Sequence, residues 1–434
     1  MKCLKKVAMM AICAAMASAM VFAGGSKDTT GSQNQSAASS EKPVKISFWH
    51  IGTAATDKAF YQGVVDAYMK AHPNVTIDIT ILENEAFKQK LSTVMQSGNP
   101  PDVFHNWGGG VLAEYAKAGL LKDITKYVKG TPFGDSMAPG VWQVYAYNGK
   151  QYGAPHDMGA VTFWYNKDLL AKVGYTTFPT TWGDFIVLVK KLKAAGITPI
   201  ALGGGDKWPA MYYFAYFALR IGGPDTFANL SAGKGFNDPT FIKAAQMLAD
   251  LTAIQPFQDG YLGTTYTDEG ALMGNGGAAM ELMGQWAPNV QNDSSTTKKG
   301  LGDKLGCAPF PAITGEKGKI TEVMGGGNGM AIGKNAPPEA IDFLEFLDNK
   351  ENNAKYATVA GIIPTVKGAE VGIKDPNAKL VKSIVDQCTF FQLYPDQFLP
   401  PAAGSALNDA VQTIIAGTAT PAQACAAIQT AYEQ

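Results

Sequence analysis

Four of the seven tryptophans in this chain stand where apolar sequence gives way to polar, glycine-rich or proline-rich sequence: Trp49, Trp107, Trp208 and Trp286. An indole face can cover the apolar face of a pyranose ring while neighbouring polar groups bind the sugar hydroxyls. Tryptophans also fill the edges of hydrophobic cores, and for each residue taken alone that alternative stays open. Four tryptophans in such contexts together favour a carbohydrate-binding site.

Polar side chains that can bind sugar hydroxyls complete the candidate site: His50, Glu83, Asn106, Asp157 and Lys207. A carboxylate such as that of Asp157 can accept two hydrogen bonds at once, although it could equally cap a local turn. Asn84, beside Glu83, is explained equally well as the cap of the following helix. We expect these five polar residues to bind ligand together with the four tryptophans.

Cleavage of a glycosidic bond would need two carboxyl groups on either side of that bond, one of them with a raised pKa. Asp157, Glu83 and Glu281 are candidates, but no sequence motif places two of them together. The sequence also lacks a nucleophile elbow, a phosphate-binding loop and a zinc-protease motif. It therefore predicts a binding protein without catalytic residues. A carbohydrate-active hydrolase is the alternative, which shortened oligosaccharide products would reveal.

His50, His105 and His156 all fall near the predicted ligand rim, so a metal site is an alternative for this region. Three imidazoles can bind zinc, but none of these histidines pairs with another at short helical spacing. The glycine runs 108–110, 203–205 and 325–327 lack the residues of a nucleotide-binding loop and predict tight turns near the ligand. We therefore expect no metal and no cofactor.

Strands and helices alternate through the first part of the chain and would position these residues. The predicted strands are 44–48, 75–82 and 101–104, and the predicted helices are 57–70, 85–96 and 111–118. This β-α-β-α-β order predicts a parallel sheet with helices on both faces. The carboxyl ends of its strands face the ligand crevice, so Trp49, Glu83 and Trp107 should lie on one rim.

A second α/β section follows Gly159. Its predicted strands are 162–165, 198–202 and 278–283, its predicted helices are 180–195, 211–220 and 241–253, and the segments 167–172, 329–332, 339–348 and 400–415 complete the pattern. No internal repeat at a fixed period is visible.

Composition and length limit the classes of binding partner and the number of lobes. A net charge of −1 gives no electrostatic reason to bind nucleic acid or acidic membranes. Hydrophobic residues make up 46% of the chain, as in an ordinary globular protein. The chain is too long to fold around one compact core, so its length predicts two lobes. Cys307, Cys388 and Cys425 are widely spaced, so they allow at most one disulfide and no metal cluster.

The amino-terminal residues predict export. Residues 1–6 carry three lysines, residues 7–22 are small and apolar, and Val21-Phe22-Ala23 fits a signal-peptidase site. We therefore expect a cleaved signal peptide at 1–23, a mature chain that begins at Gly24, and a disordered spacer at 24–42. No cysteine follows the cleavage site, which disfavours a lipid anchor. The prediction is a soluble periplasmic protein.

Several motifs in order carry a family resemblance. The strongest is the segment 165–170, Tyr-Asn-Lys-Asp-Leu-Leu, followed by 179–185, Pro-Thr-Thr-Trp-Gly-Asp-Phe. Further matches are 99–103 with 118–121, 196–200, 208–209, 284–286 and 407–412. The chain resembles the family-1 extracellular solute-binding proteins that serve ABC sugar importers, the family that includes maltose-binding protein.

This resemblance implies a type II periplasmic-binding-protein-like α/β fold with two lobes and a ligand cleft between them. The first lobe would take 43–157 and 322–361, and the second would take 160–320 and 364–434, with crossovers near Gly159 and 361–364. The implied partners are a di- or oligosaccharide and the membrane permease of an ABC importer, and we expect a monomer. A receptor for another small solute stays open as an alternative.

Overall fold

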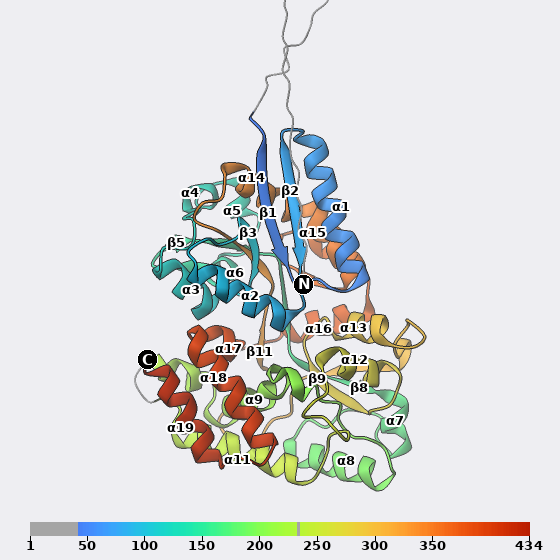
Figure 1. Cartoon of the computed structure of the whole chain (residues 1–434). Helices are drawn as coiled ribbons and strands as arrows, with labels where there is room; N and C mark the ends of the chain where they lie inside the picture. The colour runs from blue at the N-terminus through green and yellow to red at the C-terminus, as the bar shows by residue number, and fades with distance from the viewer. Residues whose placement is uncertain (1–41, 232–234) are drawn as a thin grey trace, which may run out of the picture. The chain divides into compact units, whose positions relative to one another are not determined.

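The computed structural model describes residues 42–231 and 235–434. The predicted signal peptide, 1–23, and the predicted spacer as far as residue 41 lie outside the described residues. Residues 42–434 form one compact unit. Within this unit two lobes can be distinguished, because each has its own sheet and its own hydrophobic core (Figure 1).

The first lobe is built on a five-stranded sheet with the strand order β2-β1-β3-β12-β6. Its strands are β1 (Val44–His50), β2 (Val75–Ile81), β3 (Val103–Asn106), β12 (Gly329–Ile332) and β6 (Gly153–Pro155). β1 pairs in parallel with β2 and β3, which confirms the predicted parallel order, and β12 runs antiparallel to β3 and β6. The helices of this lobe are α1 (Ala55–Ala71), α2 (Asn84–Gln96), α3 (Gly109–Lys117), α14 (Pro338–Leu347) and α15 (Lys350–Ala360), with the short α4 (Thr125–Val128), α5 (Pro132–Asp135) and α6 (Pro139–Gln143).

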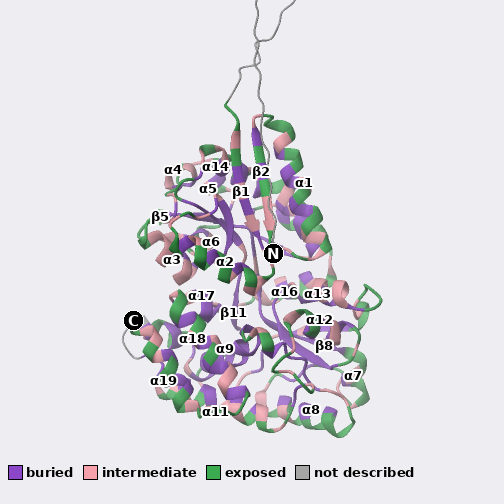
Figure 2. Cartoon of the chain, in the orientation of Figure 1, coloured by how far each residue is buried: buried purple, intermediate pink, exposed green. Residues whose placement is uncertain are grey.

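The second lobe holds a three-stranded antiparallel sheet with the order β10-β8-β9. Its strands are β10 (Leu305–Ala308), β8 (Thr162–Asn166) and β9 (Met280–Met283). Helix α9 (Trp208–Gly222) is buried from Trp208 to Ile221 and forms the centre of this lobe (Figure 2). The other helices are α7 (Lys167–Lys172), α8 (Trp182–Ala194), α10 (Asp225–Ser231), α11 (Pro239–Ala253), α12 (Tyr266–Gly274), α13 (Ala287–Ser294), α16 (Pro376–Asp386), α17 (Pro395–Phe398), α18 (Pro401–Ile415) and α19 (Pro421–Tyr432).

Chain crossings between the lobes meet in a four-stranded sheet with the order β13-β7-β11-β14. Its strands are β13 (Ile363–Pro364), β7 (Asp157–Ala160), β11 (Glu322–Gly326) and β14 (Phe390–Leu393). A side chain at Gly325 would collide with the backbone of Gly159. The prediction of a tight turn at 325–327 is therefore wrong for Gly325 and Gly326, because both belong to β11. Gly325 allows two strands to approach closely, and a side chain at Gly326 would collide with the ring of Tyr394.

Each hydrophobic core is built from stretches of the chain that lie far apart in the sequence. Side chains from Ile46 to Ala154 and from Met330 to Ala378 pack in the core of the first lobe. Val323 and Met324 pack in the other core, with α9 and α18. The lobe boundaries themselves stay a prediction.

Most predicted elements are present, with one clear exception. The segment 198–202, predicted to be a strand, makes only isolated bridges at Ile200 to Phe257 and Met280. Pro199 has no N–H to donate to a strand ladder, and the Leu202 N–H donates to the side chain of Gln258, 3.0 Å away. The segment is therefore extended beside β9 without forming a regular strand.

The described residues include no helix long and apolar enough to cross a membrane. Cys307, Cys388 and Cys425 carry free thiols.

Candidate functional site

A cavity of about 360 Å³ lies between the two lobes. Five of the nine predicted site residues line this cavity: Glu83, Trp107, Asp157, Trp208 and Trp286. They come from the carboxyl ends of β2 and β3, from crossover strand β7, and from the starts of α9 and α13. The other four predicted residues are not in its wall: Trp49, His50, Asn106 and Lys207.

Aromatic rings from both lobes form much of the wall. The rings of Trp208 and Trp286 lie 6.5 Å apart on the second lobe, and Tyr266 lies 5.1 Å from Trp208. Trp107 stands on the first lobe, with its ring 4.5 Å from that of His105. Trp107 and Trp286 are half-buried, which leaves part of each indole facing the cavity.

Several tyrosines in the wall were missed by reasoning from the sequence: Tyr61, Tyr212, Tyr266, Tyr356 and Tyr394. Tyr212 lies on helix α9, whose aromatic richness is visible in the sequence but does not show which side chains face a ligand. Trp208 also begins α9 and is only 7% exposed. The predicted helix 211–220 therefore begins earlier than expected, at Trp208, because Pro209 and the residues after it continue directly as helix.

Asp157 lies in the wall and also holds the crossover together. Its two carboxylate oxygens accept hydrogen bonds from the backbone N–H and the side-chain amide of Asn328, both at 2.8 Å. Burial raises the pKa of Asp157 above its ordinary value, against the lowering effect of those hydrogen bonds. Asp157 therefore lines the cavity, and its carboxylate bonds a residue 171 positions away in the sequence, whereas the alternative interpretation was the cap of a local turn. Its binding to a ligand stays a prediction.

Asp57, at the start of α1, is a second wall carboxylate that was not singled out in the sequence. The Tyr356 hydroxyl donates to its Oδ1 at 2.9 Å. Burial raises the pKa of Asp57 to about 6; the Tyr356 hydrogen bond lowers it, and the charges of Asp157 and Asp293 raise it further. Burial and neighbouring negative charges both favour the neutral form of a carboxyl group, which explains the direction of this pKa change.

Local packing explains why two of the strand-end residues lie outside the wall. His50 is buried, with its ring 4.3 Å from that of Tyr61, and its Nδ1 accepts the N–H of Gly52 at 3.1 Å. Asn106 is also buried, and its Oδ1 accepts the N–H of Gly108 at 2.7 Å. Both side chains therefore fix the backbone that carries neighbouring wall residues.

The remaining two residues point to other surfaces. Trp49 lies beside α2, where the Lys90 ammonium is 4.7 Å from its ring. Lys207 is exposed and forms an ion pair with Asp409 at 2.5 Å. Participation of these residues in ligand binding stays a prediction.

Within residues 42–231 and 235–434, no group of three His, Cys, Asp or Glu side chains is arranged to hold a metal ion. Burial, and to a smaller extent the charge of His156, lower the pKa of both His50 and His105. The three histidines do not converge as a ligand set.

The model of the bacterial extracellular solute-binding protein family matches residues 52–354. The chain belongs to this family. The resemblance seen in the sequence motifs is thereby confirmed.

Relatives of this solute-binding protein match nearly its whole folded part. A Pyrococcus horikoshii protein named as an uncharacterised ABC transporter extracellular-binding protein is 27% identical over 363 residues, 82% of this chain and 78% of the relative. A solved structure from work on xylan utilisation by Caldanaerobius polysaccharolyticus is 29% identical, with a TM-score of 0.82 over 89% of this chain and 99% of that one. A chitin oligosaccharide binding protein is 26% identical, with a TM-score of 0.82 over 90% and 98% of the two chains. The predicted two-lobe α/β fold is confirmed.

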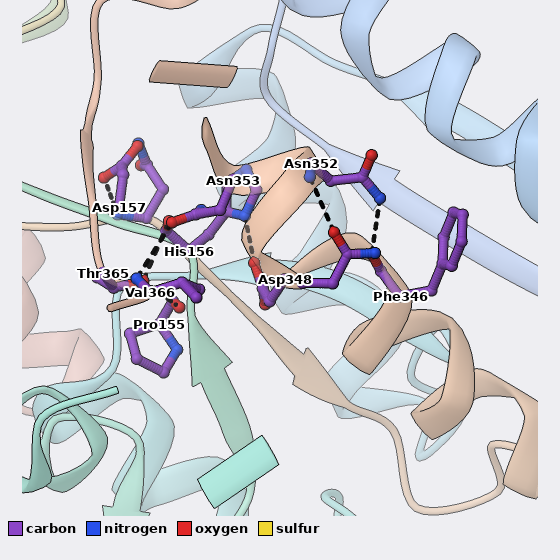
Figure 3. Close-up of polar contacts among 11 residues, drawn as sticks. Pro155, His156, Asp157, Phe346, Asp348, Asn352, Asn353, Thr365 and Val366 are labelled. Atoms are coloured by element: carbon purple, nitrogen blue, oxygen red, sulfur yellow. Dashed lines mark hydrogen bonds and ion pairs between the residues drawn. The ribbon is translucent and has the colours of Figure 1, made fainter. Parts of the chain in front are cut away.

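Behind the cavity of this solute-binding protein, a buried polar network ties the crossovers to α14 and α15 (Figure 3). His156 Nδ1 contacts the Asp348 carboxylate, and both side chains are fully buried. The Asn353 amide donates to the backbone oxygen of His156 at 2.7 Å, and the Thr365 hydroxyl donates to that of Pro155 at 3.0 Å. Burial lowers the pKa of His156, but the charge and hydrogen bond of Asp348 outweigh it and raise that pKa.

A second buried network lies beneath the tryptophans of the second lobe. Glu269 Oε2 accepts the N–H of Gly203 at 2.7 Å, and Glu281 Oε1 accepts the side-chain amide of Gln291 at 2.6 Å. Burial raises the pKa of Glu281 to about 8, and burial together with the charge of Glu281 raises that of Glu269. Glu269 therefore links α12 to the turn before α9, which carries Trp208, and Glu281 links β9 to α13, whose start carries Trp286.

Proposed function

We propose that this protein is a periplasmic receptor that binds a di- or oligosaccharide and delivers it to the permease of an ABC importer. The observation that carries the proposal is the cavity between the lobes, whose wall contains tryptophans from both lobes together with carboxylates. Indole faces and hydroxyl-binding carboxylates are the two components that a sugar needs. The relatives named for xylan utilisation and for chitin oligosaccharide binding support the same ligand class.

The proposed mechanism is closure of the two lobes around the sugar. A ligand that contacts Trp107 on one lobe and Trp286 on the other stabilises only the closed state, and this difference in affinity shifts the population. The permease then recognises the surface of the closed form, so that it engages only a receptor that has bound a sugar. No covalent step is required, and we expect incubation with oligosaccharides to yield no shortened products; turnover would contradict a pure receptor.

Export and monomeric state belong to the same proposal. We expect mass spectrometry of the exported protein to give a chain that begins at Gly24 without a lipid, and light scattering to give the mass of one chain. A diacylglyceryl adduct would contradict the soluble form.

Removing one indole from the cavity should weaken sugar binding without abolishing it. We expect Trp286→Ala and Trp208→Ala each to cost about 1–3 kcal/mol of binding free energy, the scale of an aromatic face lost from a desolvated site. Titration calorimetry with sugars chosen from a thermal-shift panel measures this change. Trp208→Ala should also lower stability because Trp208 is buried, so Trp286→Ala is the cleaner variant. Trp182→Ala, on α8 and outside the cavity wall, is the matched control, and equal affinities in all three variants would contradict the site.

Closure requires the lobes to meet closely at α3 and α17. A Cβ at Gly110 would lie 2.5 Å from the backbone oxygen of Phe398 and 2.6 Å from that of Leu399. Leu112 of α3 packs in a core of the first lobe and Leu399 in that of the second. The added methyl group of Gly110→Ala should therefore hold these faces apart.

We expect Gly110→Ala to weaken sugar binding about tenfold, because the closed state would become less populated. Small-angle scattering with saturating sugar should give a larger radius of gyration than for the unmodified protein. Gly140→Ala is the control, since a Cβ there has no neighbour within 4 Å. Unchanged affinity and radius in Gly110→Ala would show that closure does not depend on this contact.

A further inference from the structure

We infer that helix α13 of the second lobe completes the hydrogen bonding of two helix ends on the first lobe, and that these contacts favour the closed form with or without a sugar. The contacts join Asp293 to the start of α1 and Asn289 to the end of α15. The inference rests on the closure proposed above, but it does not depend on which sugar binds. It assigns part of the free energy of closure to the protein itself.

The start of helix α1 has no capping side chain at its N-cap position. The helix begins at Ala55, and the residue before it, Ala54, has no side-chain oxygen that could accept a hydrogen bond. The first N–H groups of a helix have no partner within the helix, which makes alanine a poor N-cap residue. These N–H groups of α1 are therefore open to an acceptor from another part of the chain.

Asp293 of α13 supplies that acceptor. Its Oδ2 accepts the N–H of Ala55 at 3.1 Å. Helix α1 packs in the core of the first lobe through Phe60 and Val64, whereas α13 packs in the core of the second lobe through Ala287. The hydrogen bond therefore crosses from one lobe to the other. A carboxylate at the amino end of a helix is also favoured by the helix dipole.

The place of Asp293 in its own helix is unfavourable. Asp293 lies in the last turn of α13, where a negative charge opposes the helix dipole. This local cost in α13 and the missing cap of α1 are both offset when the two lobes meet. Two local conflicts that are resolved by the same contact are typical of a residue kept for function.

Asn289 makes the second contact from the same face of α13, because it lies four residues before Asp293. Its side-chain amide donates to the backbone oxygen of Ala360, the last residue of α15. Tyr356 and Ala357 place α15 in the core of the first lobe. The last carbonyl groups of a helix have no partner within the helix. One face of α13 thus offers an acceptor to a helix start and a donor to a helix end.

The ion pair between Lys88 of α2 and Asp396 of α17 also joins the lobes, at 3.8 Å. Lys88 pairs more closely with Glu85 of its own lobe, at 3.0 Å. Opening would therefore leave the charge of Lys88 compensated, whereas the N–H of Ala55 and the oxygen of Ala360 would lose their partners on α13. The contacts of α13 consequently distinguish the closed form from the open form more strongly than this ion pair does.

A double-variant cycle across the hydrogen bond between Asp293 and Ala55 tests the inference. Asp293→Ala removes the acceptor, and Ala55→Pro removes the donor. Proline is favoured at the first position of a helix, and Ala54 already has the extended backbone, with ψ 149°, that suits a residue before proline.

The cycle is measured by titration calorimetry with the tightest-binding sugar of a panel that includes xylotriose, N-acetylglucosamine trimer, maltotriose and raffinose. We expect each single variant to weaken binding about fivefold, the scale of one helix cap, because the form that binds sugar becomes less populated. The double variant should bind no more weakly than either single variant, since both changes remove the same hydrogen bond.

Asp238→Ala is the matched control. The carboxylate of Asp238 accepts the N–H of Thr240 at 2.9 Å and so caps α11 within the second lobe. Loss of this cap should lower the thermal midpoint and leave the affinity for sugar unchanged.

Three results of the cycle would overturn the inference. An effect of Asp293→Ala that Ala55→Pro does not reproduce would assign Asp293 to direct contact with the sugar. Effects that multiply in the double variant would show two separate causes, and unchanged affinity in both single variants would show that closure does not depend on this contact.

Failure of the proposed function would give a different result. If no sugar of the panel binds, the proposed function fails, and scattering from the ligand-free protein decides the inference alone. We then expect the combined Asp293→Ala and Asn289→Ala variant to have a larger radius of gyration than the unmodified protein. Equal radii would overturn the inference.

Discussion

We expect Asp348→Ala to lower the free energy of unfolding by about 3–5 kcal/mol, the range for breaking a buried ion pair by removing one partner. His156 would be left buried beside an empty space, with its Nε2 already unpartnered. The local loss of structure should be largest in the hydrogen-bonded network that includes Pro155 and Thr365 (Figure 3). Urea denaturation followed by circular dichroism measures the loss.

The control for this variant is Asp386→Ala. Asp386 forms an ion pair with Lys382 at 2.6 Å on the surface of α16, with its side chain 58% exposed. Removing a surface pair of this kind should change stability by no more than about 0.5 kcal/mol. Equal effects of the two variants would contradict a structural role for the buried pair at the crossovers.

Stability should fall as the pH rises from about 5 to 8, because burial raises the pKa of Glu281 to about 8 in the folded protein. Below its ordinary pKa, Glu281 is protonated in both the folded and the unfolded chain. Between the two values the unfolded chain loses the proton while the folded chain keeps it, so unfolding becomes more favourable. Each such proton lowers stability by up to about 1.4 kcal/mol per pH unit.

Glu281→Gln tests this assignment because glutamine keeps the shape and the acceptor for Gln291 but cannot ionise. We expect the variant to be more stable than the unmodified protein at pH 8 and to have a shallower pH dependence of its thermal midpoint. Glu351→Gln, at an exposed position of α15, should retain the original slope. A variant with the same slope as the unmodified protein would assign the pH dependence elsewhere.

The sequence was sufficient for the first sheet because its strands and helices have strong periodicities. The apolar residues of β2 alternate, and Val75 and Ile77 are buried accordingly. Thr181 predicts the start of α8, and its hydroxyl does accept the N–H of Asp184 at 3.2 Å. The prediction of a strand at 198–202 was wrong because an apolar run does not show whether its backbone groups will bond a neighbouring strand or a side chain such as that of Gln258.

The candidate site was only partly predictable because position at a strand end does not fix side-chain direction. Trp107 and His50 both stand at the carboxyl end of a strand, yet Trp107 faces the cavity while His50 packs on Tyr61. Asp57 lies within a predicted helix, where a carboxylate looks like an ordinary solvent-facing residue. Its contact with Tyr356 joins positions 299 residues apart, and no local pattern in the sequence signals such a pair.

The interleaving of the two lobes also constrains the order in which the protein can fold. The first core requires side chains as far along as Ala378, and the second requires side chains from Ala160 to Ile428. A chain that emerges from the ribosome amino-terminus first therefore lacks part of both cores until nearly all of it has been synthesised. Two consecutive domains would instead fold one after the other during translation. Crossing back and forth through β7, β11 and β13 should thus keep the nascent chain unfolded for longer, the state in which a translocation channel can thread it.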